Sequence, residues 1–283
     1  MTTACVARRW VFLVLLAACA PAMAQSASLS LADGKIILLR GVATYSIEVG
    51  AKLETGDMIE TGAKGQAQVE FADGLILNLG PQSKLYLLNI AADPAKAAQL
   101  ALASGWLKAA VPAGRKGTPR DLQYLLPGLE IDTKDATVVM HAASPADEVF
   151  IESGQATAGA IGPDGTAGQA VTLKGSDYAS RKDAAVVIGR PPTGFFGSVP
   201  RHYMDNLPAL YAKVKDLQRE PVREHDTTYA EAAAWLEANK TVRAGLLARY
   251  QPRAKDAEFR SALLATMSAH PEWEHTVGSA KKK

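Results

Sequence analysis

The feature that most constrains the fold is a series of short apolar runs between Ala27 and Arg181. The runs are rich in Val, Ile and Leu, and turns that contain glycine interrupt them every ~8–12 residues, which is typical of all-β proteins. Apolar residues make up 48% of the chain and charged residues 21%, a balance that excludes a disordered or fibrous protein. The sequence therefore predicts a mainly β fold, either a β-sandwich or a short β-solenoid.

Two Asp-Gly pairs, Asp33-Gly34 and Asp73-Gly74, lie between apolar stretches and are predicted to form hairpin turns. Glycine suits such turns because it adopts positive φ without strain. Apolar and polar residues alternate on both sides of the second pair. One face of that hairpin is expected to be buried, with Gln68, Glu70 and Asn78 facing outward.

The pattern changes at Pro191-Pro192, after which apolar residues recur at helical spacing. Thr228 and Glu231 fit a capping box, and Asp256 fits a helix N-cap. A further helix is predicted from one apolar stripe, formed by Leu207, Leu210, Tyr211, Val214 and Leu217. Residues 25–283 are thus predicted to form two parts. A β-domain covers residues 25–190, and a proline-rich hinge with a small C-terminal α-helical region covers residues 191–283.

Residues 1–24 have the organisation of a secretory signal peptide. Arg8 and Arg9 provide a positive start, Trp10–Ala18 is an apolar run too short to span a bilayer, and Ala22–Ala24 is a small-residue cleavage motif. We expect a mature chain that begins at Gln25 and is periplasmic. No later apolar run reaches the length of a transmembrane helix.

A competing interpretation of the leader is a lipoprotein signal, because Leu16–Cys19 matches a lipobox in which Cys19 would be acylated. Cys5 and Cys19 are the two cysteines of the chain, so a chain cleaved before Gln25 would have no disulfide or thiolate chemistry. The net charge of +2 equals that of Arg8 and Arg9, so such a chain would be formally neutral. A nucleic-acid partner is therefore not expected, since such partners require a basic surface.

Candidate catalytic and metal-binding residues are not evident. The histidines show none of the paired spacings of zinc sites; they are His141, His202, His225, His270 and His275. The sequence contains no nucleophile elbow, P-loop or dinucleotide-binding motif, so we assign no catalytic residue, metal ligand or cofactor. Four aromatic residues of the β-domain could instead stack on sugar rings, with core packing as the alternative: Tyr86, Trp106, Tyr124 and Tyr178.

Three consecutive stretches resemble the core motif of the FecR domain, a β-rich periplasmic module. They are Leu53–Gly62 (LETGDMIETG), Gly65–Gly74 (GQAQVEFADG) and Leu79–Leu85 (LGPQSKL). The resemblance extends over about Ala27 to Arg181. The residues that carry it are expected to be structural turn and core residues, and they are Gly56, Asp57, Thr61, Gly62, Phe71, Asp73 and Gly74.

The resemblance implies a role in the cell envelope. FecR proteins that regulate sigma factors carry a cytoplasmic segment and a membrane helix before the periplasmic domain, whereas here a leader is followed directly by the domain. We therefore expect a noncatalytic binding or adaptor module that engages an envelope protein or a cell-wall glycan such as peptidoglycan. The alternatives are a sensory subunit that passes an envelope signal to a separate membrane protein and, third, an unrecognised envelope hydrolase.

Overall fold

The structure is a computed structural model of the chain and describes residues 27–90, 97–111, 121–143, 146–162 and 164–278. The predicted signal peptide, its cleavage site and Cys19 lie outside these residues. Within the described part of the chain, no helix is both long and apolar enough to cross a membrane.

The strands precede the helices, as the sequence predicts, except that β16 follows α2. The strands are β1 (Ala27–Asp33), β2 (Ile36–Arg40), β3 (Ala43–Ser46), β4 (Lys52–Leu53), β5 (Met58–Thr61), β6 (Gln66–Phe71), β7 (Ile76–Leu79), β8 (Lys84–Asn89), β9 (Ala98–Ala110), β10 (Asp121–Leu125), β11 (Leu129–Ala142), β12 (Glu148–Ala160), β13 (Val171–Lys174), β14 (Tyr178–Lys182), β15 (Ala185–Gly189) and β16 (Val222–Asp226). The helices are α1 (Phe195–Ser198), α2 (Tyr211–Val214), α3 (Tyr229–Leu236), α4 (Lys240–Arg243), α5 (Leu246–Tyr250), α6 (Ala257–Ala265) and α7 (Glu274–Gly278), with short 3₁₀ turns η1 (Arg201–Tyr203), η2 (Arg253–Lys255), η3 (Met267–Ala269) and η4 (Pro271–Trp273).

The described strands form one mixed sheet, in the order β15-β14-β12-β11-β10-β9-β8-β5-β2-β3-β16, with β4-β1-β6-β7 joined to it through β9. Three long strands, β9, β11 and β12, each contain one residue with positive φ, at Gly105, Asp135 and Gly154. At Gly105 a side chain would come within 2.5 Å of Ser83 Oγ, so only glycine fits this close approach. The bends allow the sheet to fold over one apolar core, which confirms the mainly β prediction.

That core is made by the β-domain alone. Its buried members begin at Ala27 in β1 and end at Ala179 in β14, and they include fully buried Leu29, Phe71 and Ile151. Each such side chain contributes roughly 1.5–3 kcal/mol by leaving water. The residues after position 190 add no member to this cluster, but they cover other faces of the sheet.

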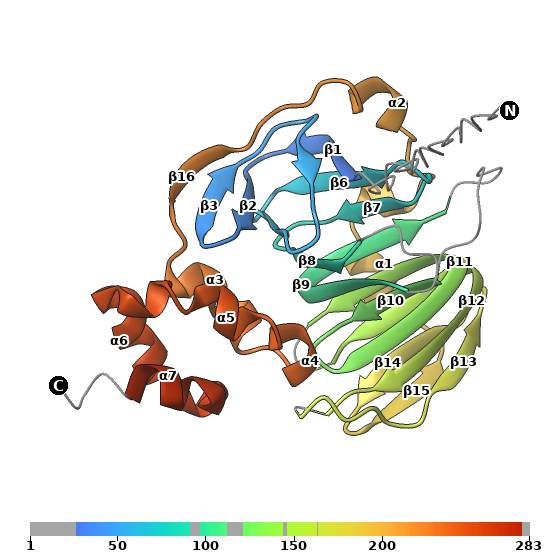
Figure 1. Cartoon of the computed structure of the whole chain (residues 1–283). Helices are drawn as coiled ribbons and strands as arrows, with labels where there is room; N and C mark the ends of the chain where they lie inside the picture. The colour runs from blue at the N-terminus through green and yellow to red at the C-terminus, as the bar shows by residue number, and fades with distance from the viewer. Residues whose placement is uncertain (1–26, 91–96, 112–120, 144–145, 163, 279–283) are drawn as a thin grey trace, which may run out of the picture.

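Residues 191–226 run around the β-domain as an extended segment, which we call the strap. In Figure 1 the strap passes from α1, behind the sheet, to α2 and then to β16, beside the N-terminal strands. Phe195 and Tyr203 pack against Trp106, and β16 pairs antiparallel with β3. The strap thereby places α3 to α7 on the outer face of the sheet. The predicted boundary between residues 190 and 191 stays a prediction, but the two regions share extensive contacts.

The outward-facing side of β6, β7 and β9 is buried under the strap, so the prediction that Gln68, Glu70 and Asn78 face solvent is wrong. Their exposed fractions are 0%, 2% and 0%. The Glu70 carboxylate accepts the backbone N–H of Leu210 at 2.8 Å and that of Tyr211 at 2.8 Å, at the start of α2. The alternation itself is correct, since these residues point away from the apolar core. What it could not reveal is a later segment that covers them.

Two other local predictions are corrected by the pairing. Asp33-Gly34 is a turn with φ of +74° at Gly34, but it joins β1 and β2, which do not pair with each other. The helix expected from Leu207 to Leu217 is reduced to the single turn α2, which begins at Tyr211, where Glu70 accepts the first N–H groups. The capping box at Thr228 and the N-cap at Asp256 are confirmed.

Gly74 closes the β6–β7 hairpin with φ of +91°, and its N–H bonds to the carbonyl of Phe71 at 2.9 Å. A β-branched residue is strained in this conformation, so Gly74→Val should lower the free energy of unfolding by roughly 1–3 kcal/mol. Urea unfolding measures the change. Gly189→Val is the matched control because its new Cβ meets no atom within 4 Å and its φ is not positive. Equal stabilities of the two variants would show that the turn is not strained.

Candidate functional site

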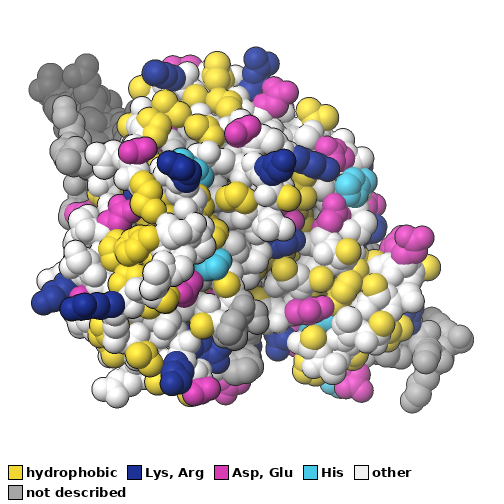
Figure 2. Space-filling model, turned by 180° about the vertical axis from the view of Figure 1, so that it is seen from behind, with side chains coloured by type: hydrophobic (Ala, Val, Ile, Leu, Met, Phe, Trp, Pro, Cys, Tyr) yellow, Lys and Arg dark blue, Asp and Glu magenta, His cyan; other side chains and the backbone are white. Residues whose placement is uncertain are grey.

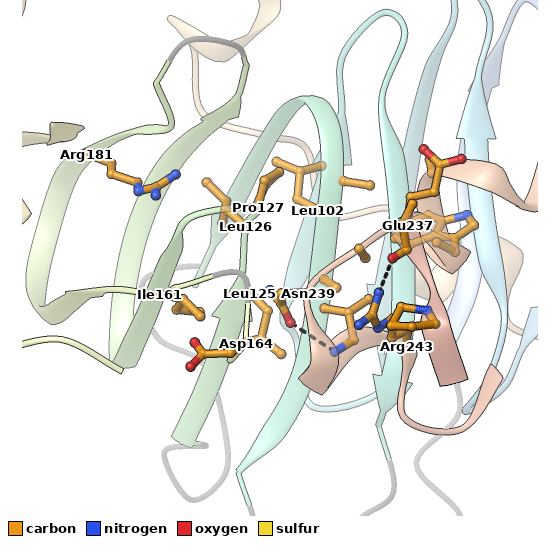
Figure 3. A pocket seen from close by; sticks show the side chains of 18 of the residues that line it. Leu102, Leu125, Leu126, Pro127, Ile161, Asp164, Arg181, Glu237, Asn239 and Arg243 are labelled. Carbon is orange, nitrogen blue, oxygen red and sulfur yellow. Dashed lines mark hydrogen bonds between the residues drawn. The ribbon is translucent and has the colours of Figure 1, made fainter. Parts of the chain in front are cut away.

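The candidate site is a cleft of about 640 Å³ between the outer face of the sheet and the C-terminal helices. Its size lies within the range of ~300–1,000 Å³ usual for ligand pockets. Figure 3 shows the sheet side with Leu102, Leu125 and Leu126, and the helical side with Asn239 and Arg243. Figure 2 views the molecule from the side opposite to that of Figure 1. On this side the surface is indented between the β-domain and the C-terminal helices.

The sheet side of the cleft is apolar because outward side chains of β9 and β10 form it. Ala101 and Ala103 of β9 lie beside Leu125 of β10, in the parallel pair of the sheet. Trp235 of α3 packs edge-on against Tyr86, with ring centroids 5.6 Å apart, and so holds the helical side against the sheet. The alternation of β9 and the helical spacing of α3 therefore produce two facing apolar walls.

Asn239 is the most buried polar side chain in the helical wall, with an exposed fraction of 7%. Its Oδ1 accepts the backbone N–H of Val242 at 3.1 Å and thereby caps α4. Among the described residues, its Nδ2 has no hydrogen-bond partner. A buried donor without a partner costs about 1–3 kcal/mol, so this amide is suited to receive an acceptor from a ligand.

Arg181 reaches the cleft from β14, and Figure 3 shows its guanidinium directed toward Leu126 and Pro127. Its buried Nε also has no partner among the described residues. The backbone N–H of Arg181 donates to the carbonyl of Asp147 at 3.0 Å, and the Asp147 carboxyl, which is 2% exposed, accepts the N–H of Gly128 at 2.6 Å. Burial raises the pKa of Asp147 to about 6, against the lowering effect of the Gly128 hydrogen bond and of Arg181.

The remaining charged groups of the cleft are already engaged. Arg243 donates to the carbonyl of Ala269 at 2.5 Å and lies 3.3 Å from the Glu272 carboxylate. Glu237 accepts the hydroxyl hydrogen of Tyr229 at 2.9 Å. Asp164 is exposed and bonds to Thr166, whose hydroxyl lies 2.6 Å from it. The acids thus lie on exposed positions, and the unpartnered donors lie deeper.

The residues of the FecR motif lie outside the cleft, in turns and in the core. Asp57 is 1% exposed and forms two contacts with Arg40, Nε–Oδ1 at 2.8 Å and Nη2–Oδ2 at 2.6 Å. This hydrogen-bonded pairing raises the pKa of Arg40 above its usual value. Gly56, with φ of +95°, donates its N–H to the carbonyl of Leu87 at 2.7 Å.

The other motif residues have similar surroundings. Thr61 Oγ1 donates to the Gly80 carbonyl at 2.7 Å, and the Gly62 carbonyl accepts from Gly65 at 2.9 Å. Asp73 accepts the N–H of Leu75 at 3.1 Å next to Gly74, and Phe71 is fully buried in the main core. None of the motif residues lines the cleft.

The aromatic residues proposed for sugar stacking are buried, with exposed fractions of 1–8%: Tyr86, Trp106, Tyr124 and Tyr178. Trp106 stacks on His141 with ring centroids 3.9 Å apart, and Glu148 bonds to both His141 and Tyr178. The bond to His141 lowers the pKa of Glu148. Within the described residues, no group of three or more His, Cys, Asp or Glu side chains is placed to hold a metal ion.

Sequence reasoning missed every polar residue of the cleft, because they come from separate parts of the chain: Asp164, Arg181, residues 237–243 and Ser268. The one local signal was Asn239, which precedes Lys240–Arg243 as an N-cap does. An N-cap role explains an asparagine at this position without any ligand. The pattern therefore gave no reason to expect that its amide nitrogen would lack a hydrogen-bond partner.

The buried carboxyl of Asp147 predicts a pH-dependent stability. Its pKa is 3.8 in an ordinary setting and about 6 in the fold, so its protonated form favours folding and this contribution is lost as the pH rises through 6. Asp147→Asn keeps an acceptor for Gly128 and stays neutral. Its free energy of unfolding should exceed that of the wild type by roughly 1–3 kcal/mol at neutral pH and match it at pH near 4.

Urea unfolding across this pH range measures the difference. Asp216→Asn, at a side chain that is 83% exposed, is the control and should leave the pH profile unchanged. Parallel profiles of Asp147→Asn and the wild type would contradict the prediction, because they would mean that the Asp147 carboxyl has the same pKa in the folded and unfolded chain.

Comparison with known proteins gives one family match and two structural neighbours. The profile of the family FecR protein matches residues 57–170. No curated protein sequence matches the chain. Two crystal structures of a candidate anti-sigma factor from Parabacteroides distasonis have a TM-score of 0.38, with 12% and 11% identity, over 48% of this chain and 61% of that chain.

The family match at residues 57–170 contains the β6–β7 hairpin, Asp57, which pairs with Arg40, and strands β9 to β12. The chain therefore contains a FecR domain over residues 57–170.

Proposed function

We propose that this protein is a noncatalytic regulatory protein of the bacterial cell envelope that binds a ligand in the cleft between its FecR domain and its C-terminal helices. The family match supports the regulatory part, since FecR proteins are regulatory rather than enzymatic. Export by the predicted signal peptide and a periplasmic location belong to the same proposal.

The observation that carries the proposal is the position of the cleft. The FecR domain supplies one wall, with Leu102 and Leu125, and the helical region supplies the other, with Asn239 and Val242. A ligand bound there would contact both regions at once. Ligand binding would then favour one arrangement of the two regions over others, which is the physical basis of a sensor.

The polar lining of the cleft argues against catalysis. Among the described residues, Ser268 in the helical wall has no hydrogen bond to an acid or a base, and so lacks the partner that activates a nucleophile. The inner donors are an amide and two guanidinium groups, which are binding groups at neutral pH.

An adaptor that engages an envelope protein or peptidoglycan is the second candidate. It is favoured by β15, which lies at the end of the sheet order and exposes Val187 by 45% and Ile188 by 46%. An edge strand with exposed apolar residues offers unpaired backbone groups to a partner chain. The two candidates differ in the surface they use, so one set of variants separates them.

Filling the cleft tests the regulatory proposal. Ala103→Phe places a ring in the cleft, whereas Ala257→Phe places the same ring on the exposed first residue of α6. In cells that make the protein, we expect Ala103→Phe to alter the same envelope-related transcripts as deletion of the gene. Ala257→Phe should leave them at wild-type levels, and transcript profiling provides the measurement.

If deletion changes no transcripts, the regulatory proposal fails and the adaptor remains. If deletion changes transcripts but Ala103→Phe does not, the cleft is not the site. Abundance and melting temperature of each variant, measured in parallel, ensure that a folded protein is being compared.

A further inference from the structure

We infer that the free edge of β15 pairs with β15 of a second copy of this chain, so that the sheet continues through a two-fold axis at Val187. The inference goes beyond the proposed function, because it concerns the end of the sheet and not the cleft. It is drawn from the composition of this edge, from the backbone groups that the sheet leaves free there and from the side chains beside them.

The composition of β15 sets it apart from the strand at the other end of the sheet. Figure 1 shows β15 and β16 far from each other, at the two ends of the strand order. β16 has the sequence VREHD, and charged residues of this kind keep an edge from pairing with other chains. β15 has the sequence AVVIG, without a charge or a proline, and β14 is the one described strand that pairs with it. The edge of β15 therefore lacks the features that prevent pairing.

The backbone groups that are free at this edge follow from the pairing of β14. The N–H of Arg181 donates to the carbonyl of Asp147 at 3.0 Å, on the side of β14 that faces β12. Successive residues of a strand direct their backbone groups to opposite sides, so Ser180 hydrogen-bonds toward β15, where it lies opposite Val187. By the same alternation, the residues before and after Val187 direct their N–H and C=O groups to the free edge.

These free groups are self-complementary. In an antiparallel pair centred on Val187, Val186 of each copy lies opposite Ile188 of the other copy, and each such pair exchanges two N–H···O=C bonds. Both copies then use the same surface, as two-fold dimers do. The register also places Arg190 of each copy beside the turn that contains Asp183 of the other, so opposite charges approach at both ends of the pair.

The side chains of β15 favour the same pairing. Val186 packs against the main core, and Ile188 lies opposite the fully buried core residue Ala179, yet Ile188 is 46% exposed. The main core is thus open at this edge, and the valine and isoleucine of a second copy would cover it. Val187, on the other face of the sheet and 45% exposed, would pack against its own counterpart. Apolar cross-strand pairs of this kind stabilise a sheet.

The expected dimer is weak and reversible, because two strands of five residues form a contact smaller than a standard interface. Sedimentation equilibrium of the full chain should show an average mass that rises from that of the monomer toward twice that value as the concentration increases. Val187→Lys and Val187→Glu each place two like charges opposite each other on the axis, so either variant alone should stay monomeric. An equimolar mixture of the two should dimerise again, because a lysine then faces a glutamate.

Val222→Lys is the matched control, because it makes the same exchange in β16, at a side chain that is 66% exposed. It should dimerise as the wild type does. The inference is overturned if the wild type stays monomeric up to about 1 mM, if Val187→Lys dimerises like the wild type, or if the mixture stays monomeric. A monomeric wild type would leave this edge to a partner strand, as the adaptor candidate requires. Val187 does not line the cleft, so the transcript effect of Ala103→Phe tests the proposed function separately.

Discussion

The structure depends on how the polar outer side of β6, β7 and β9 is satisfied. Glu70 and Lys108 are buried there as charged side chains, at exposed fractions of 2% and 3%, and burial of a charge is costly unless hydrogen bonds compensate. Glu70 takes the first N–H groups of α2, and Lys108 donates to the carbonyl of Tyr203 at 2.6 Å and contacts Glu152 at 2.8 Å. The strap is thereby fixed to the FecR domain by the Glu70 carboxylate and the Lys108 ammonium group. On an exposed sheet face these two groups would form hydrogen bonds to water instead.

The helical region owes its position to this attachment. From α2 the strap continues to Lys215, whose carbonyl accepts a hydrogen bond from Lys52, and then to β16 on the edge of β3. After β16 the chain forms α3 to α7, which pack on the outer face of β2, β5 and β8. The cleft therefore exists because two regions that are far apart in sequence are held at a fixed distance. A ligand between them would compete or cooperate with the same contacts.

The sequence predicted the parts of the fold that depend on local chemistry. The β6–β7 hairpin, the capping box at Thr228 and the N-cap at Asp256 each rest on residues that are close in the chain, and all three are present. It did not predict β16, because Val222–Asp226 is mostly charged and each of its residues is exposed, as an edge strand tolerates. The burial of Gln68 and Asn78 was missed for a related reason, since their cover comes from residues about 130 positions later.

The candidate site was beyond prediction from sequence because its walls come from β9, β10, β14, α3 and α4. No spacing rule relates Arg181 to Asn239, and neither forms part of a known motif. The residues that the FecR resemblance singled out were different ones, and they lie in turns and in the core. Recognition of the family thus indicated the domain, whereas only the assembled structure brings the cleft together.

Amide hydrogen exchange at the start of α2 tests the central claim, that buried Glu70 holds the strap. The N–H groups of Leu210 and Tyr211 donate to its carboxylate and should exchange slowly in the wild type, although α2 is a single turn. In Glu70→Gln, where one of the two acceptor oxygens becomes a donor, both amides should exchange faster, while those of β11 and β12 stay unchanged. Exchange at the rate of an exposed loop in the wild type, or equal protection in Glu70→Gln, would contradict the account.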